Sequence, residues 1–123
     1  MTLVLIDKSA YVRGEASVAD RDELCLCAVT RLELLYSARS APDYELLEDD
    51  LQQFRDLGMD AETFAVALQA QRELARRGQH RVPVPDLLIA SCAQQYGADV
   101  LHVDRHYDRL ASVLAFRSRR PRK

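Results

Sequence analysis

The sequence lacks the features that mark membrane, fibrous or disulfide-stapled proteins. It contains no tryptophan, and only four glycines, four prolines and three cysteines in 123 residues. Its apolar runs, such as those at 3–6 and 87–90, are far shorter than the roughly 20 residues that span a bilayer, and no charged-then-apolar leader opens the chain. With 48 % hydrophobic and 29 % charged residues, the chain is expected to form one soluble domain in the cytoplasm, without membrane contact.

The sequence also lacks an excess of basic residues outside its last seven positions. Its 17 bases and 19 acids give a net charge of −2, but five of those bases lie in the last seven residues, so residues 1–116 hold 12 bases and 19 acids. Nucleic-acid binding usually needs basic side chains opposite the phosphates, which an acidic body does not offer. We interpret residues 1–116 as the folded domain and residues 117–123 as a solvated basic tail.

The cysteines and histidines show no metal-binding spacing. Cys25 and Cys27 lie one residue apart in an apolar run, and Cys92 lies in a run with helical periodicity. Because no Cys-x-x-Cys pair or neighbouring histidine completes a zinc pattern, the cysteines are expected to pack as small buried hydrophobic side chains. The histidines lack the i,i+4 spacing of a helical metal site, and we interpret them as surface or supporting residues: His80, His102 and His106.

Short apolar runs alternate with helical patterns along the chain. Strands are expected at 3–6, 24–29, 100–103 and 113–116, and helices at 9–13, 30–36, 43–57, 60–77, 86–96 and 107–110. Thr30 is the expected N-cap of its helix. A polar linker is expected at 16–23. Strands separated by helices favour an α/β fold, in which helices cover both faces of a parallel sheet, because parallel neighbours need crossover connections.

Four acids stand where such a fold gathers its chemistry. Asp7 and Asp104 each follow an apolar run, at the carboxyl edge of the expected sheet. Glu33 lies one turn into the helix after the second strand, and Asp86 lies in the first turn of the helix after a proline-containing loop. Taken singly, each has a plainer explanation as a helix-capping, surface or turn residue. Taken jointly, the four are predicted to converge on one cleft.

Converging carboxylates predict a metal-dependent reaction. They repel one another and raise one another's pKa unless a cation lies among them. Mg²⁺, or Mn²⁺ as the alternative, takes oxygen ligands and leaves positions for water and phosphate oxygens. One or two such ions can activate water and stabilise the leaving oxygen of a phosphodiester, which is nuclease chemistry.

Three blocks of sequence carry a resemblance to a known family. They are Leu-Ile-Asp-Lys-Ser-Ala at 5–10, Val-Thr-Arg-Leu-Glu at 29–33, and Pro-Val-Pro-Asp-Leu-Leu-Ile-Ala at 83–90 with Val-Leu-His-Val-Asp at 100–104. Over about residues 3–116 the chain resembles the PIN-domain ribonucleases of the VapC type, the toxins of bacterial VapBC toxin–antitoxin pairs. The resemblance implies a PIN-like three-layer α/β/α sandwich with a central parallel sheet.

The resemblance also implies an activity and a site. It implies a Mg²⁺-dependent endoribonuclease that cuts structured RNA, either transfer RNA or ribosomal RNA, by attack of water on phosphorus. Carried over by position, the implied metal-binding and catalytic residues are Asp7, Glu33, Asp86 and Asp104, with Ser9 and Thr30 supporting them through hydroxyl hydrogen bonds.

Two positions depart from the family's pattern. Lys8 stands where many relatives have threonine, and His106 replaces a frequent aspartate two residues after Asp104. Asp108 is a candidate for part of that aspartate's role, with a helix-start acid as the alternative. Arg105 is a candidate contact to an RNA phosphate, with a structural ion pair as the alternative.

The implied partners are a VapB-type antitoxin and the RNA substrate, with a homodimer and a larger toxin–antitoxin complex as the implied assembly. The amphipathic segments 43–57 and 60–77 offer an apolar groove for the antitoxin, unless their apolar residues form the core. The alternative function is an impaired PIN module that binds RNA or antitoxin without cleaving, because of Lys8 and His106. A receiver-like phosphoacceptor and an Asp-x-Asp phosphatase are disfavoured, because the first strand ends in a single acid.

Overall fold

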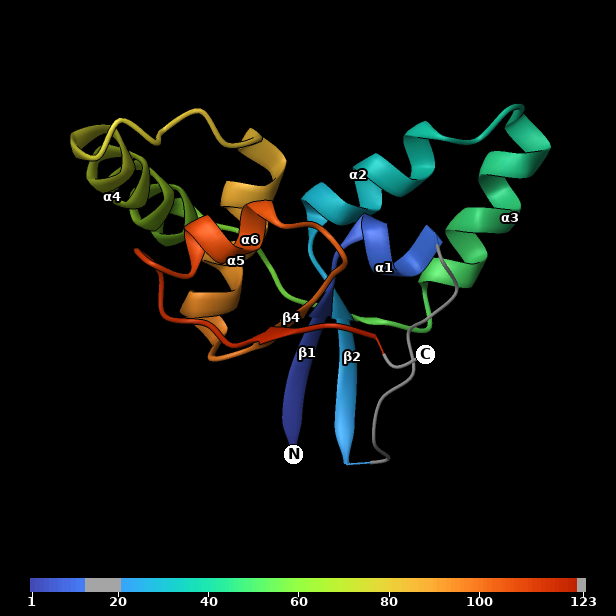
Figure 1. Cartoon of the computed structure of the whole chain (residues 1–123). Helices are drawn as coiled ribbons and strands as arrows, with labels where there is room; N and C mark the ends of the chain where they lie inside the picture. Colours follow the sequence, from blue (N-terminus) through green and yellow to red (C-terminus); the bar gives the residue numbers. More distant parts are fainter. Residues whose placement is uncertain (13–20, 122–123) are drawn as a thin grey trace.

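The computed structural model describes residues 1–12 and 21–121 and is drawn in Figure 1. In chain order its elements are β1 (Thr2–Ile6), α1 (Lys8–Val12), β2 (Asp22–Leu26), α2 (Ala28–Tyr36), α3 (Ala41–Leu51), β3 (Arg55–Asp56), α4 (Ala61–Arg76), α5 (Val84–Tyr96), β4 (Asp99–Leu101), α6 (His106–Leu110) and β5 (Ser118–Arg119). The strands form one parallel sheet in the order β3-β2-β1-β4-β5.

The central strand β1 divides its side chains between two cores. Leu5 packs with apolar residues of α4, α5 and α6, whereas Val4 and Ile6 pack with apolar residues of α1, α2 and α3. All three side chains are fully buried, as expected for a strand whose two faces are both covered by helices. The predicted three-layer α/β/α sandwich with a central parallel sheet is therefore confirmed.

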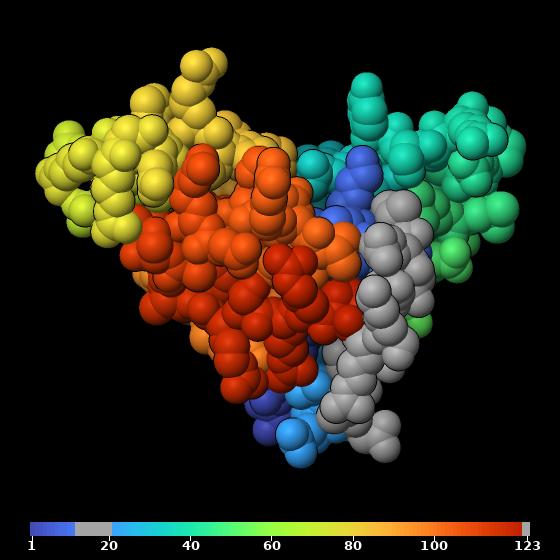
Figure 2. Space-filling model, in the orientation of Figure 1, coloured from blue at the N-terminus to red at the C-terminus, as the bar shows by residue number. Residues whose placement is uncertain are grey.

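The carboxyl ends of the strands meet beneath a hollow. Because the strands are parallel, all of them end at the same edge of the sheet. In Figure 1 this edge faces upward, and α4 with α5 on one side and α2 with α3 on the other rise above it as two arms. Figure 2 shows the surface hollowed between these arms. Asp7, which directly follows β1, lies at this edge.

The observed elements differ from the predicted ones mainly at their ends. The second strand stops at Leu26, because α2 begins two residues later. The helix predicted over 43–57 ends at Leu51, because the following residues turn and Arg55 pairs with Cys25 as part of β3. Sequence analysis misses β3 because a strand of two exposed charged residues has no apolar pattern. Most of the predicted linker at 16–23 lies outside the described residues.

The predictions for the end of the chain are partly wrong. The strand expected at 113–116 is a turn after α6, where the N–H groups of Val113 and Leu114 donate to the carbonyl of Leu110. The strand follows instead at Ser118–Arg119, which pairs with β4. Residues 117–119 therefore belong to the folded domain rather than to a solvated tail, and residues 122–123 lie outside the described residues.

Two further predictions concern burial and membranes. Cys25, Cys27 and Cys92 are free and buried, as predicted. Across residues 1–12 and 21–121, no helix has both the length and the apolar character that crossing a membrane requires.

Candidate metal centre

Asp7 is held in a fixed orientation at the end of β1. The backbone N–H and the hydroxyl of Ser9 donate to its Oδ2 at 2.9 and 2.6 Å, and the hydroxyl of Tyr107 donates to its Oδ1 at 2.7 Å. The residue is only 4 % exposed. The hydrogen bond predicted for Ser9 is therefore present. Ser9 Oγ also accepts the N–H of Val103 at 3.1 Å, which ties Asp7 to the segment that carries Asp104.

Tyr107 is a site residue that sequence analysis misses. Its side chain is fully buried in α6, with its ring centroid 4.5 Å from that of His102 and 6.2 Å from that of Phe116. Burial and the neighbouring charge of Asp7 raise the pKa of Tyr107 well above its usual value, so the phenol stays protonated and keeps donating. The sequence signal is weak, since a tyrosine in a short helix is usually part of an apolar core.

His102 shapes the backbone that leads to Asp104. Its Nδ1 accepts the N–H of Asp104 at 3.2 Å, so the proton of the neutral ring lies on Nε2, which is hydrogen-bonded to Ser118 Oγ. The ring is fully buried, and burial lowers the pKa of His102. Its expected surface position is therefore wrong and its expected supporting role is observed, with both nitrogens engaged.

Asp86 is a buried acid, and one of its carboxyl oxygens has no hydrogen-bond partner among the described residues. It lies in the first turn of α5, where the N-cap position belongs to Pro83, so Asp86 is not the capping residue. It is 7 % exposed, and its Oδ2 has no hydrogen-bond partner among the described residues. Burial first, and then the charges of Asp7, Asp104 and Glu33, raise the pKa of Asp86 to about 7. An oxygen in this position can act as a ligand to a cation.

Glu33 completes the set of predicted acids. It is half-buried on α2, and burial followed by the charge of Asp7 raises its pKa, while the charge of Lys8 lowers it. Glu33 and Asp7 both act electrostatically on Asp86, as does Asp104. The structure therefore brings the four predicted acids together at one edge of the sheet.

His106 joins two of these acids in a group that fits a metal ion. Within the described part of the chain, one ligand atom each from Asp86, Asp104 and His106 lie within 4.8 Å of one another. The His106 ring nitrogen Nε2 is 3.6 Å from Oδ1 of Asp104, and the backbone N–H of His106 donates to the same oxygen at 3.0 Å. Two carboxylates, one with an unpartnered oxygen, and an imidazole form a donor set that suits a divalent cation. Sequence analysis expected no ligand role for His106.

Thr30 lies inside helix α2 and not at the N-cap position predicted for it. Helix α2 begins at Ala28 with Cys27 at the N-cap position, so the prediction of Thr30 as N-cap is wrong. The Thr30 hydroxyl is fully buried, 3.6 Å from Sγ of Cys27. That contact is to a thiol rather than to an acid of the site.

The two remaining candidates lie on the surface around α6. Asp108 is an exposed acid in the first turn of α6, and its carboxylate is 3.8 Å from Nη2 of Arg120. Asp108 is therefore placed as an acid at the start of a helix, which is the alternative given for it from the sequence. Arg105 is exposed immediately before α6, and lines a surface pocket together with His106. Its contact to RNA stays a prediction.

Comparisons with known proteins relate both the sequence and the fold to one family. The model of the PIN domain family matches residues 4–113. "Ribonuclease VapC17" of Mycobacterium tuberculosis is 42 % identical over 120 residues, which cover 92 % of this chain and 90 % of the relative. "Ribonuclease VapC18" of the same species is 45 % identical over 95 residues, which cover 75 % and 69 %.

Solved structures support the fold. A DNA-bound VapBC from Salmonella typhimurium contains a chain that superposes with a TM-score of 0.79 at 21 % identity, covering 98 % of each chain. A chain of VapBC-5 from Mycobacterium tuberculosis gives a TM-score of 0.71 at 18 % identity and covers 100 % of each chain.

Proposed function

The chain belongs to the PIN domain family, among its VapC ribonucleases, and from this premise we propose that it is the metal-dependent endoribonuclease toxin of a toxin–antitoxin pair. The observation that carries the proposal is the buried, unpartnered Oδ2 of Asp86, which lies among the carboxylates of Asp7, Glu33 and Asp104. The proposed cofactor is a divalent cation, Mg²⁺ or Mn²⁺. The proposed substrate is a structured RNA, transfer RNA or ribosomal RNA, cleaved in the cytoplasm.

We assign metal binding and proton transfer to different acids of the site. Asp86 and Asp104 would hold the cation, with Asp7 and Glu33 beside them. A bound divalent cation offsets the carboxylate charge, attracts phosphate and lowers the pKa of a nearby water. We assign Glu33 to accept the proton of the attacking water, because it is a half-buried carboxylate close enough to Asp7 and Asp86 to act on both electrostatically.

The residues around Asp7 hold its carboxylate in a fixed position. Ser9 and Tyr107 fix both of its oxygens, so the carboxylate does not need to reorient when substrate binds. Arg105, exposed at the rim of the site, is assigned to an RNA phosphate.

The antitoxin is the proposed protein partner. The solved neighbours are VapBC assemblies, and this chain exposes apolar side chains on the helices of both arms. They include Leu32 and Tyr36 on α2, Leu46 on α3, and Phe64 and Leu68 on α4. We propose that a VapB-type antitoxin and a second copy of the chain cover these surfaces.

Cleavage of RNA by purified protein tests the proposal. Wild-type protein with a divalent cation is expected to produce new 5′-phosphate ends, and EDTA or Asp86→Asn to lower the rate by at least about 100-fold, as for loss of a group that stabilises the transition state. Asp49→Asn makes the same chemical change at an exposed position of α3 and should leave the rate unchanged. Cleavage that persists in both EDTA and Asp86→Asn contradicts a metal site at Asp86.

The alternative is a module that binds RNA or antitoxin without cutting. It is favoured by Lys8, whose positive charge acts on Glu33 and lowers the pKa of that carboxyl. Sequencing of 5′-phosphate ends separates the two functions, because the alternative predicts bound RNA with no new ends.

A further inference from the structure

We propose that His106 is itself a ligand to the cation, and that its imidazole makes the site selective for first-row transition-metal dications over Mg²⁺. This inference rests on the proposed metal site and names the chemistry of its ion. The group of Asp86, Asp104 and His106 supplies one nitrogen and carboxylate oxygens within 4.8 Å of one another. A nitrogen ligand in that position changes which metals bind well.

The backbone places the His106 ring at the site. His106 is the first residue of α6, and its N–H donates to Oδ1 of Asp104, the same oxygen that lies 3.6 Å from its Nε2. The His106 side chain is 41 % exposed, so the ring is partly shielded from water yet still accessible to an ion. Small side-chain adjustments around a bound ion therefore leave His106 beside Asp104.

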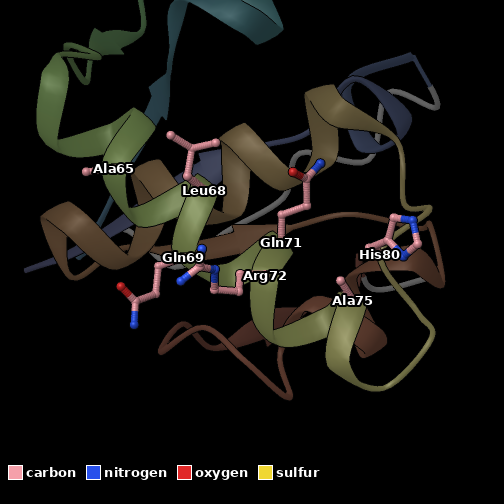
Figure 3. Close-up of a pocket in the computed structure, with 7 residues that line it drawn as sticks. All are labelled: Ala65, Leu68, Gln69, Gln71, Arg72, Ala75 and His80. Carbon is pink, nitrogen blue, oxygen red and sulfur yellow. The ribbon is translucent and has the colours of Figure 1, made fainter.

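The other two histidines cannot take this role. Both nitrogens of His102 are engaged, one by the N–H of Asp104 and the other by Ser118 Oγ. His80 lines a separate pocket along α4 with Leu68 and Arg72, as Figure 3 shows. Since the chain has three histidines, His106 is the imidazole that can reach an ion held by Asp86.

The buried oxygen of Asp86 independently indicates that a ligand binds here. Asp86 is 7 % exposed, and its Oδ2 has no hydrogen-bond partner among the described residues. A buried acceptor without a partner is unfavourable, and a charged one is more so. Because Asp86 belongs to the same group as His106, a cation bound by the Asp86 carboxylate is within reach of the imidazole.

The donor set determines the selectivity. Mg²⁺ prefers oxygen ligands in a near-ideal octahedron and keeps several waters, so an imidazole adds little to its affinity. First-row transition-metal dications accept imidazole nitrogen better than Mg²⁺ does, with Mn²⁺ the weakest of the series. Replacing even a hydrogen-bond partner of a metal ligand typically changes affinity by about 10–100-fold, so replacing the ligand itself should shift selectivity by at least about tenfold.

Pulsed electron paramagnetic resonance with Mn²⁺ as the probe tests the inference directly. Wild-type protein loaded with Mn²⁺ is expected to show the ¹⁴N modulation of a coordinated imidazole. His106→Asp, which substitutes an oxygen ligand, should bind Mn²⁺ without this modulation, and Mg²⁺ should displace Mn²⁺ from it at a concentration at least about tenfold lower than from wild type. His80→Asp is the matched control and should behave as wild type.

Three results would overturn the inference. They are a wild-type protein that binds Mn²⁺ without imidazole modulation, a modulation that survives in His106→Asp, and a wild-type protein that binds no Mn²⁺. Circular dichroism and thermal unfolding show whether each variant is folded. RNA cleavage by wild type and Asp86→Asn is measured in parallel. Lost cleavage in Asp86→Asn without imidazole modulation in wild type contradicts His106 as ligand and leaves the metal-dependent ribonuclease intact. Imidazole modulation in a wild-type protein that cleaves no RNA contradicts only the ribonuclease.

Discussion

The ionisation of Asp86 links the site to the stability of the whole domain. Its pKa is about 7 in the folded protein, raised from an ordinary value of 3.8, first by burial and then by Asp7, Asp104 and Glu33. Between these two values the folded state holds a proton that the unfolded state has released. Without metal, the free energy of unfolding should therefore fall as pH rises from about 4 to about 7, by about 3–4 kcal/mol from this residue.

Asp86→Asn should remove most of that pH dependence. The amide carries no charge, so urea unfolding in EDTA at several pH values between 4 and 8 should give a flatter profile than wild type. Glu33, whose pKa is also raised, contributes a remaining slope of the same sign. Asp49→Asn, at an exposed position, should keep the wild-type profile. If the free energy of unfolding of wild type and of Asp86→Asn changes with pH in the same way, ionisation of Asp86 does not destabilise the folded protein.

At the residue scale, the acids of the site and the support from Ser9 were predictable, and the contacts of Tyr107 and His102 were not. Asp7 and Asp104 follow apolar runs, and the end of a parallel strand is a position that a sequence pattern marks. Tyr107 and His102 act through a buried hydroxyl and a buried ring, and a sequence does not show which polar groups of an apolar segment meet. His106 was treated as a departure from a pattern, although its place two residues after Asp104 brings it into the site.

At the scale of elements, the strand β5 depends on charge rather than on apolar periodicity. Arg119 donates from Nε to Asp99 at 2.7 Å and from Nη1 to Asp22 at 2.9 Å, and so joins the amino-terminal ends of β4 and β2. Arg117 also donates to Asp99. The long core elements were predictable because periodic apolar residues mark them, whereas β5 consists of a serine and an arginine that sequence analysis placed in a tail.

Removal of the Arg119 side-chain charge should therefore destabilise the domain. The side chains of Asp22 and Asp99 are 2 % and 10 % exposed, so Arg119→Met weakens the neutralisation of buried charge, which typically costs about 3 kcal/mol in free energy of unfolding. Arg120→Met is the matched control, because Arg120 is 53 % exposed and its pair with Asp108 is 3.8 Å long, and it should cost less than about 1 kcal/mol. If urea unfolding shows that the two variants lose the same free energy of unfolding, residues 117–119 form a solvated tail rather than part of the folded domain.

At the scale of the molecule, a group of four acids lies where RNA is proposed to bind. The chain carries a net charge of −2, and four of its 19 acids gather at one edge of the sheet. Two divalent cations there would bring the chain from −2 to +2. RNA affinity should therefore rise with divalent metal, and more steeply than a small net charge suggests, because the charge that changes lies at the phosphate-binding surface.

Two double variants separate local charge from net charge. Asp86→Asn with Asp104→Asn removes two negative charges at the site, and Asp49→Asn with Asp50→Asn removes two from the exposed face of α3. In EDTA, fluorescence anisotropy should show the site variant binding labelled RNA more tightly than wild type and responding less to added metal. The α3 variant should gain less affinity and keep the wild-type response to metal. Equal gains would mean that net charge governs binding, because long-range repulsion alone does not depend on which acids are neutralised.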